Sequence, residues 1–261
     1  MKQLAINGTT LSVVDEGEGH PVLLVHGFPL SHSMWSAQIE VLSAKYRVIA
    51  PDLRGFGQNE SAAGKLTMEQ FADDLAAILD ELQIEQPVTY CGLSMGGYIF
   101  WDFWRRHADR LNSVILCDTR AVADEEDKVR NRHKMAASVL NHGPEACARI
   151  MLPGLFAEQT DRSIVASLEA VILATPPESI AAALGGMAER ADSAELQSKI
   201  DVPTLIIVGE HDKISTASEM RSMADEIPDC DFLEVPGAGH MVPMEKPELV
   251  NEAILAFLNR F

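Results

Sequence analysis

Short apolar runs alternate with longer amphipathic segments along the first 119 residues of the chain. The run Val22–Val25 is apolar throughout, which is typical of a strand buried on both faces of a parallel sheet. Thr67–Leu82 instead carries apolar residues at helical spacing, and Thr67 is the expected N-cap of that helix. Strands that alternate with helices at this rhythm predict a doubly wound, mostly parallel sheet.

The pattern predicts an N-terminal hairpin, six further strands and five helices outside one long interruption. The hairpin pairs Gln3–Asn7 with Thr10–Asp15 around Gly8. The expected later strands are Val22–Val25, Tyr46–Ala50, Val88–Gly92, Val114–Cys117, Thr204–Val208 and Phe232–Val235. The expected helices are Met34–Ala44, Thr67–Leu82, Met95–His107, Ser215–Ile227 and Pro247–Leu258. In such a sheet the functional site is expected at the carboxyl ends of the strands.

The interruption follows the sixth expected strand, since the rhythm stops after Thr119 and resumes at Thr204. Residues 120–191 show helical patches without a clear strand, and the pattern becomes irregular around Met151–Phe156. Pro176-Pro177 and Gly185-Gly186 are expected to break helices there. We therefore expect an α/β core domain of residues 1–119 and 192–261, with a helical cap of residues 120–191 inserted into it.

A candidate nucleophile lies where the expected strand Val88–Gly92 meets the expected helix Met95–His107. The segment Gly92-Leu93-Ser94-Met95-Gly96 has the G-x-S-x-G pattern, which in a strand–turn–helix context exposes the serine hydroxyl above the sheet. The glycines are expected because a side chain at either position would collide with the neighbouring backbone. The N–H of Met95, at the helix N-terminus, is expected to be one donor of an oxyanion hole.

A serine nucleophile needs a base, and the base needs an acid that orients it. His240, on a loop of small residues after the last expected strand, is the predicted base. Asp212, which follows the seventh strand, is the predicted acid, and the order serine, acid, histidine fits the fold. Glu210 and Asp118, which also lie at strand ends, remain alternatives for the acid.

The loops after the third and fourth strands supply further polar groups. The N–H of Phe28 is the predicted second oxyanion donor, because Pro29 has no N–H to offer. His26 is interpreted as a structural histidine that bonds nearby backbone. Asp52–Gly57 is interpreted as a structural turn, in which Asp52 and Arg54 could pair with each other or bond the loop backbone.

Composition limits the function further. Hydrophobic residues make up 47% of the chain, and 39 acidic against 21 basic residues give a net charge of −18, which disfavours binding to nucleic acid or to an anionic membrane. No run of about 18 apolar residues and no signal peptide is evident, so no membrane association is expected. The four cysteines have neither C-x-x-C nor zinc-site spacing. We expect a cytoplasmic protein without disulfides or a metal.

Taken together, five segments resemble the α/β-hydrolase superfamily along essentially the whole chain. Within it the chain is similar to small carboxylesterases, 3-oxoadipate enol-lactonases and cofactor-free haloperoxidases or perhydrolases. The resemblance implies an eight-stranded sheet and a helical cap over the site. The expected serine mechanism needs no metal or organic cofactor. Relatives with aspartate at the elbow are dehalogenases or epoxide hydrolases, and Ser94 argues against both. The segments are His26-Gly27-Phe28-Pro29, Asp52–Gly57, Gly92–Gly97, Gly209-Glu210-His211-Asp212 and Gly237-Ala238-Gly239-His240.

These features predict a carboxylesterase that acts on small, uncharged acyl esters through an acyl-enzyme. Its pocket is expected to be apolar and lined by Leu30, Met151, Leu152, Leu155, Phe156, Met241 and Val242. A lactonase for a dicarboxylate lactone is the nearest alternative, and its basic group would come from the cap residues Arg120, Arg130, Arg132 or Arg149. Perhydrolase side activity is a further alternative, and a non-catalytic receptor for a small ligand is an alternative of a different class. The oligomeric state stays open.

Overall fold

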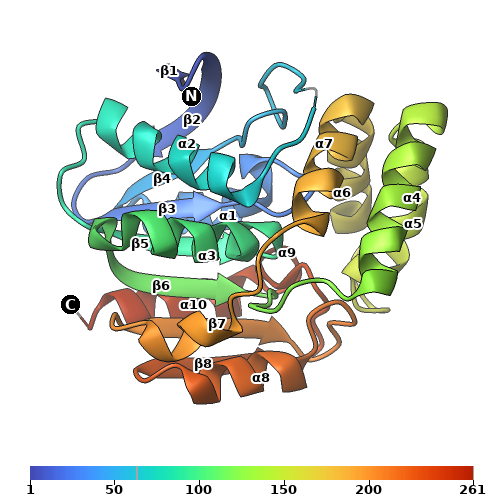
Figure 1. Ribbon diagram of the computed structural model, residues 1–261. Coiled ribbons are helices and arrows are strands. Elements are labelled where there is room, and N and C mark those ends of the chain that lie inside the picture. Colours follow the sequence, from blue (N-terminus) through green and yellow to red (C-terminus); the bar gives the residue numbers. More distant parts are fainter. Residues whose placement is uncertain (63, 261) are drawn as a thin grey trace.

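A single mixed sheet forms the centre of the computed structural model, which describes residues 1–62 and 64–260 (Figure 1). The sheet has eight strands in the order β1-β2-β4-β3-β5-β6-β7-β8. β1 pairs antiparallel with β2, and β2 pairs antiparallel with β4, whereas every later pair is parallel. The strands are β1 Lys2–Ile6, β2 Thr9–Glu16, β3 Pro21–Val25, β4 Arg47–Pro51, β5 Val88–Leu93, β6 Leu111–Cys117, β7 Thr204–Gly209 and β8 Cys230–Val235.

The predicted sheet is confirmed, including its hairpin and its eight strands. All residues of β3, β5 and β7 are buried, as expected for strands covered on both faces. β8 begins two residues before the predicted start at Phe232. It is an edge strand with a mostly half-exposed pattern, so its first residues lack the continuous apolar run that marks the central strands.

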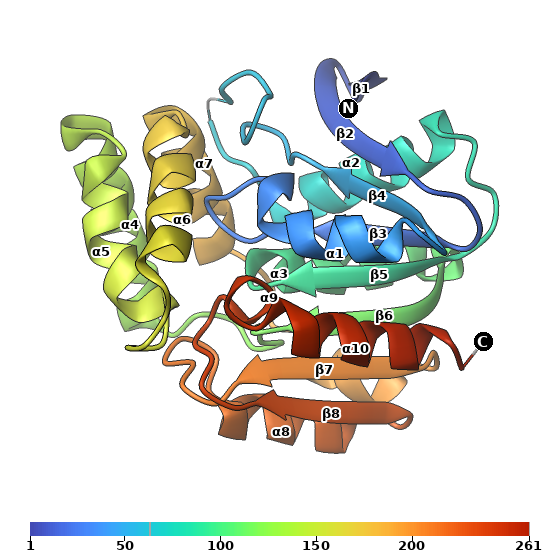
Figure 2. The ribbon, with the colours of Figure 1, turned by 180° about the vertical axis from the view of Figure 1, so that it is seen from behind.

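Helices cover both faces of the sheet (Figures 1 and 2). α2, α3 and α8 lie on one face, and α1 and α10 lie on the other. Thr67 caps α2 as predicted, because its side chain accepts a hydrogen bond from the N–H of Gln70. The predicted helix Met34–Ala44 is instead a 3-10 turn, His32–Trp35, capped by Ser31 and followed by a shorter α1. The bounds are α1 Ser36–Leu42, α2 Met68–Glu81, α3 Met95–His107, α8 Ala217–Glu226, α9 Val242–Glu245 and α10 Pro247–Leu258.

Four helices between β6 and β7 stand over one end of the sheet (Figures 1 and 2). They are α4 Glu126–His142, α5 Glu145–Leu155, α6 Arg162–Ala174 and α7 Pro177–Ala188. We refer to residues 120–191 as the cap. We propose that the cap is a unit separate from the α/β core.

Two predicted irregularities of the cap are wrong. The Met151–Phe156 segment belongs mostly to α5, which includes Pro153 and ends two residues after it. Gly185 and Gly186 lie inside α7 instead of breaking it. A Cβ on Gly186 would overlap the carbonyl oxygen of Leu66, so this glycine permits close packing of α7 against the core.

Among the described residues, no single helix is long and apolar enough to cross a membrane. α6 and α7 would meet the criteria of length and composition only as a pair, and the chain bends by 97° between them.

The contact at Gly186 gives a prediction about how the cap is anchored. Gly186→Ala should lower the free energy of unfolding by about 1–3 kcal/mol, because the added methyl group meets rigid backbone. Gly185→Ala is the matched control: its Cβ would lie 3.9 Å from the nearest atom, on the Lys65 side chain, so alanine should be neutral or stabilise α7 by up to about 1 kcal/mol. Thermal and urea unfolding of both variants measure the difference, and equal effects would contradict the proposed contact.

Candidate active site

The turn between β5 and α3 holds Ser94 in a strained backbone conformation. Its φ of 54° and ψ of −109° lie outside the regions that non-glycine residues favour. A Cβ on Gly92 would lie 2.7 Å from the backbone of Gly96, and a Cβ on Gly96 would overlap the carbonyl oxygen of Val25. Both glycines therefore allow the strand, the turn and the helix to approach closely, as the sequence pattern predicts.

Ser94 is joined to two residues from distant strand ends. Its Oγ lies 2.9 Å from Nε2 of His240, and Nδ1 of His240 lies 2.8 Å from Oδ2 of Asp212. With the ring proton on Nδ1, His240 donates to the Asp212 carboxylate and accepts from the Ser94 hydroxyl. His240 and Asp212 are buried, while Ser94 is half-buried. The structure thus brings together the three residues that were predicted to share one site.

The environment of Asp212 favours its ionised form. Burial alone would raise the pKa of this carboxyl group, but the adjacent His240 and the hydrogen bonds outweigh burial and lower the pKa below its usual value. Its Oδ1 accepts from the N–H groups of Ile214 and Ser215 at 2.7 and 3.1 Å. Asp212 is thereby fixed in orientation on both of its oxygens.

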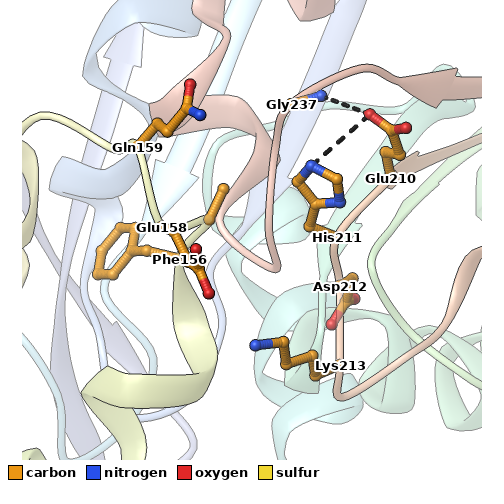
Figure 3. A pocket seen from close by; sticks show the side chains of 9 residues that line it. Phe156, Glu158, Gln159, Glu210, His211, Asp212, Lys213 and Gly237 are labelled. Carbon is orange, nitrogen blue, oxygen red and sulfur yellow. Dashed lines mark hydrogen bonds and ion pairs between the residues drawn. The ribbon is translucent and has the colours of Figure 1, made fainter.

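Glu210, one alternative for the acid, has a different position. Its carboxylate accepts from the N–H of Gly237 at 2.9 Å and lies 3.8 Å from Nε2 of His211 (Figure 3). It therefore connects the loop after β7 to the loop after β8 without a contact to His240 among the described residues.

Asp118, the other alternative, is fully buried next to the pair of Asp212 and His240. Its Oδ1 accepts from the N–H of Gly209 at 2.9 Å. Burial and the nearby Asp212 carboxylate raise the pKa of Asp118 well above its usual value. Ligand atoms of Asp118, Asp212 and His240 lie within 4.8 Å of one another, which is close enough for a metal site. The short bond between Asp212 and His240 uses the atoms that such a site would need, so this arrangement suits proton sharing better than metal binding.

The predicted oxyanion donors come from two different loops at the ends of strands. Met95 begins α3, and Phe28 follows β3. In the described part of the chain, neither backbone N–H has a hydrogen-bond acceptor, so both remain able to donate. Phe28 also lines the cavity next to Ser94.

His26 and Asp52 join the neighbouring loops. Nε2 of His26 accepts from the N–H of Leu53 at 2.9 Å, and burial lowers the pKa of His26 to about 4, so the ring is neutral. Asp52 accepts from the N–H and the ring of His32 at 2.8 and 2.7 Å. Arg54 pairs with Asp74 at 2.8 Å instead of with Asp52. These groups hold the loops in place, in agreement with their structural interpretation.

A cavity of about 200 Å³ opens beside Ser94, between the strand ends and the cap. Residues of the core and of the cap both contribute to its lining. The lining residues are Phe28, Ser94, Tyr98, Lys128, Asn131, Arg132, Met135, Met151, Leu184, Met187, Ile214 and His240.

The structure corrects the predicted lining of the pocket, because only Met151 of the seven expected residues lines this cavity. Leu30 lines a separate apolar cavity of about 400 Å³, and Phe156 lines a cavity of about 510 Å³ that Asp212 also lines (Figure 3). Leu155, Met241 and Val242 are buried in the core, and Leu152 packs against it. Proximity in sequence to the catalytic positions did not indicate which way these side chains point.

A signal for the missed lining was present in the sequence. Lys128, Asn131, Arg132 and Met135 follow the spacing i, i+3, i+4, i+7 and so share one face of α4. This stripe is mostly polar, whereas the ester prediction looked for apolar residues, and only the lactonase alternative named one of its members, Arg132. Tyr98, Leu184, Met187 and Ile214 come from three other parts of the chain, and no local pattern joins them.

The comparison with known families decides the classification. The model of the alpha/beta hydrolase fold family matches residues 20–247. The chain belongs to this family. The α/β-hydrolase sheet and the resemblance inferred from the five segments are thus confirmed, and the chain is a hydrolase by family.

Relatives of this α/β-hydrolase include the predicted kinds. It is similar to a thermophilic esterase from Thermogutta terrifontis, solved with malate bound, at 43% identity and a TM-score of 0.96, over 99% of this chain and 98% of that chain. It is 29% identical to 3-oxoadipate enol-lactonase 2 of Acinetobacter baylyi, over 100% of this chain and 95% of the relative. A bromoperoxidase from Bacillus anthracis shares 26% identity, with a TM-score of 0.86 and 96% of each chain covered.

Proposed function

We propose that this α/β-hydrolase cleaves small carboxylic esters through an acyl-enzyme on Ser94. The observation that carries the proposal is the continuous relay from Ser94 through His240 to Asp212, with heavy-atom distances of 2.9 and 2.8 Å. A hydroxyl next to a neutral imidazole, itself oriented by a buried carboxylate, is the arrangement that activates serine as a nucleophile.

In the acylation half of the reaction, Ser94 Oγ attacks the ester carbonyl while its proton moves to Nε2 of His240. Asp212 holds the imidazole and stabilises the positive charge that it gains. The N–H groups of Phe28 and Met95 would bind the oxyanion, and loss of one such donor costs about 3–4 kcal/mol of transition-state stabilisation. When the tetrahedral intermediate collapses, the C–O bond to the alcohol breaks, and His240 returns the proton to the departing alcohol.

In the deacylation half, His240 takes a proton from water, and the resulting nucleophile attacks the acyl-enzyme. Collapse of the second tetrahedral intermediate breaks the bond to Ser94, which regains its proton from His240. The products are one carboxylic acid and one alcohol. The chain's own residues supply each proton transfer.

A lactonase is a second candidate, favoured by a specific observation. Lys128 and Arg132 line the cavity beside Ser94, so the basic group that a dicarboxylate lactone would need is present. The enol-lactonase relative and the malate in the related esterase, a dicarboxylate, support this candidate. Opening of a lactone would use the same relay, with the alcohol remaining attached to the acyl group.

Replacement of the nucleophile tests the proposal. Ser94→Ala should reduce kcat for p-nitrophenyl butyrate by at least about 1,000-fold, because no other group can form the acyl-enzyme. Ser222→Ala removes an exposed hydroxyl on α8 and serves as the control with unchanged kcat. The measurement is the release of p-nitrophenol.

Covalent labelling tests whether Ser94 is an activated nucleophile. Diisopropyl fluorophosphate should add one diisopropylphosphoryl group to the peptide that contains Ser94, detected by mass spectrometry. Full activity of Ser94→Ala, or labelling at another residue, would contradict the assignment.

A further inference from the structure

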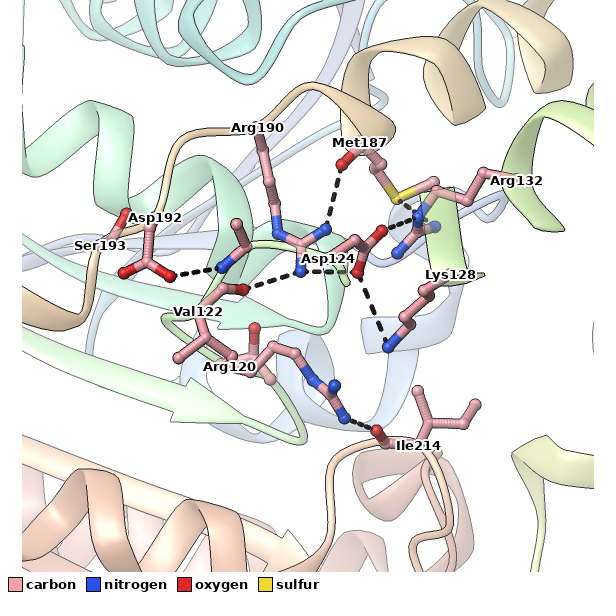
Figure 4. Close-up of polar contacts among 12 residues, drawn as sticks. Arg120, Val122, Asp124, Lys128, Arg132, Met187, Arg190, Asp192, Ser193 and Ile214 are labelled. Atoms are coloured by element: carbon pink, nitrogen blue, oxygen red, sulfur yellow. Dashed lines mark hydrogen bonds and ion pairs between the residues drawn. The ribbon is translucent and has the colours of Figure 1, made fainter. Parts of the chain in front are cut away.

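Three cationic side chains contact the buried carboxylate of Asp124, which lies just before α4 at the start of the cap (Figure 4). Asp124 has a solvent-inaccessible side chain and pairs with Arg132, with Arg190 at 2.9 Å and with Lys128 at 3.8 Å. Its bonds to the two arginines outweigh the effect of burial and lower the pKa of Asp124 to about 2, so the group stays ionised. Three cationic side chains therefore share one negative charge.

Lys128 is the least compensated member of this cluster. Within the described residues its one charged partner is Asp124, whereas both arginines approach that carboxylate more closely. Burial is the largest cause that lowers the pKa of Lys128; the nearby Arg120 and Arg132 lower it as well, while Tyr98 and Asp124 partly oppose them. The lysine thus lies in a region of excess positive charge.

The excess charge faces the cavity next to Ser94. Lys128 and Arg132 line that cavity, whereas their partner Asp124 and the third cation, Arg190, do not (Figure 4). The described lining contains two cations and no acidic residue, although acidic residues outnumber basic ones by 39 to 21 in the chain. Asn131 and Tyr98 add polar groups to the same wall.

We propose that Lys128 and Arg132 form a subsite for a carboxylate of the substrate, so that the preferred substrate is an ester or lactone that also carries a free carboxylate. This inference rests on the proposed function of Ser94 and replaces the expected uncharged acyl group. The carboxylate would complete the charge balance that Asp124 leaves open, and its ion pair would position the ester carbonyl near Ser94.

Two matched pairs of esters test the subsite. Monomethyl glutarate carries a carboxylate on the acyl side where dimethyl glutarate carries a second methyl ester. 4-Acetoxybutanoate carries a carboxylate on the alcohol side where its methyl ester is uncharged. Because each neutral member has two ester groups, rates are compared per ester group. The wild-type protein should favour the charged member of at least one pair in kcat/KM, as measured by proton release in a pH-stat.

Lys128→Met should reduce kcat/KM for the favoured charged ester about 10- to 100-fold, in keeping with the loss of a charged hydrogen bond. The neutral ester should lose a much smaller factor than the charged ester, because its transition state never used that bond. Lys134→Met removes an exposed lysine from the same helix and should leave both rates unchanged. Thermal unfolding confirms that each variant is folded.

Binding without turnover separates this inference from the proposed function. Calorimetric titration of Ser94→Ala with glutarate should show binding that the additional change Lys128→Met weakens at least about 10-fold. If glutarate binds in this way but no ester is hydrolysed, the subsite stands and the proposed function fails. The subsite is overturned if the wild-type protein has equal kcat/KM for the charged and the neutral esters. It is also overturned if Lys128→Met and Lys134→Met have equal kcat/KM for the charged ester.

A second, independent observation concerns Asp118. Its Oδ2 is buried without a hydrogen-bond partner among the described residues, and a carboxylate oxygen of Asp118 lies within 4.8 Å of one of Asp212. Two buried carboxylates at this separation cannot both be charged at low cost. Asp212 already faces His240 and two N–H groups, so the proton belongs on Asp118.

We infer that Asp118 is a positioning residue that remains protonated and donates a hydrogen bond from Oδ2 to Asp212. The groups that face it are Asp212 after β7, His240 after β8 and the buried Cys117 thiol of β6. The raised pKa of Asp118 agrees with this geometry. The bond would fix Asp212 and moderate its attraction for the proton on His240.

The variant Asp118→Asn distinguishes a protonated Asp118, which donates a hydrogen bond, from an ionised Asp118. Asparagine keeps the acceptor for Gly209 and a donor for Asp212, so kcat and the acid-side midpoint of the kcat/KM profile should remain at wild-type values. Asp118→Ala removes the donor, and we expect kcat about 10-fold lower with the acid-side midpoint at higher pH, because an unmoderated Asp212 carboxylate favours protonation of the base.

A shift of the acid-side midpoint in Asp118→Asn would overturn the inference. If Asp118 were ionised, asparagine would remove a negative charge near His240, and the acid-side midpoint would move to lower pH. This outcome does not depend on whether Asp118→Ala folds.

Discussion

Ser94 occupies a backbone conformation that costs a non-glycine residue about 1–3 kcal/mol, so its surroundings must hold it there. The N–H of Ser94 donates to the carbonyl of Cys117 at 3.0 Å, and the hydroxyl of Thr119 donates to the carbonyl of Ser94 at 2.7 Å. Both anchors come from β6 and the loop that follows it. A Cβ on Gly97 would collide with Thr119, so a third glycine keeps this second contact possible. Hydrogen bonds with β6 and the loop after it, together with the turn itself, thus hold Ser94 in its strained backbone conformation.

The same end of the sheet brings the remaining groups within reach. β6, β7 and β8 are adjacent and parallel, so the residues after them meet above one edge, although Asp118 and His240 are far apart in sequence. Parallel pairing therefore explains why one buried region contains Asp118, Asp212 and His240. The same pairing places two buried carboxyl groups close together beside one histidine, so two negative charges there would repel each other. Protonation of Asp118 removes this repulsion.

The sequence was sufficient for the sheet and for the residues at its strand ends, because each of those depends on a local pattern. Ser94 lies in a motif fixed by glycine geometry, and Asp212 and His240 lie in the short loops that follow strands. Most of the cavity lining was not predicted, because it depends on which faces of α4 and α7 turn toward Ser94. Gly186 shows the difficulty: glycine in a helix reads as a break, yet here it serves contact with Leu66, which lies 120 positions earlier. Such contacts are set by tertiary packing, which no short window of sequence contains.

Asp124 connects the assembly of the cap with the charge of the cavity. It precedes α4, and its partners are Lys128 and Arg132 on α4 and Arg190 just after α7, so one carboxylate ties together the helices that enclose the site. The guanidinium of Arg190 also stacks on Tyr98 of α3, 4.1 Å from the ring centre, which connects this cluster to the core. If the acidic groups near Asp124 equalled its three cationic partners in number, their charges would cancel and the cavity would have no net charge. Because Asp124 is outnumbered, the interactions that close the cap also leave positive charge facing Ser94, and the cap can thereby select a substrate while it holds its own helices in place.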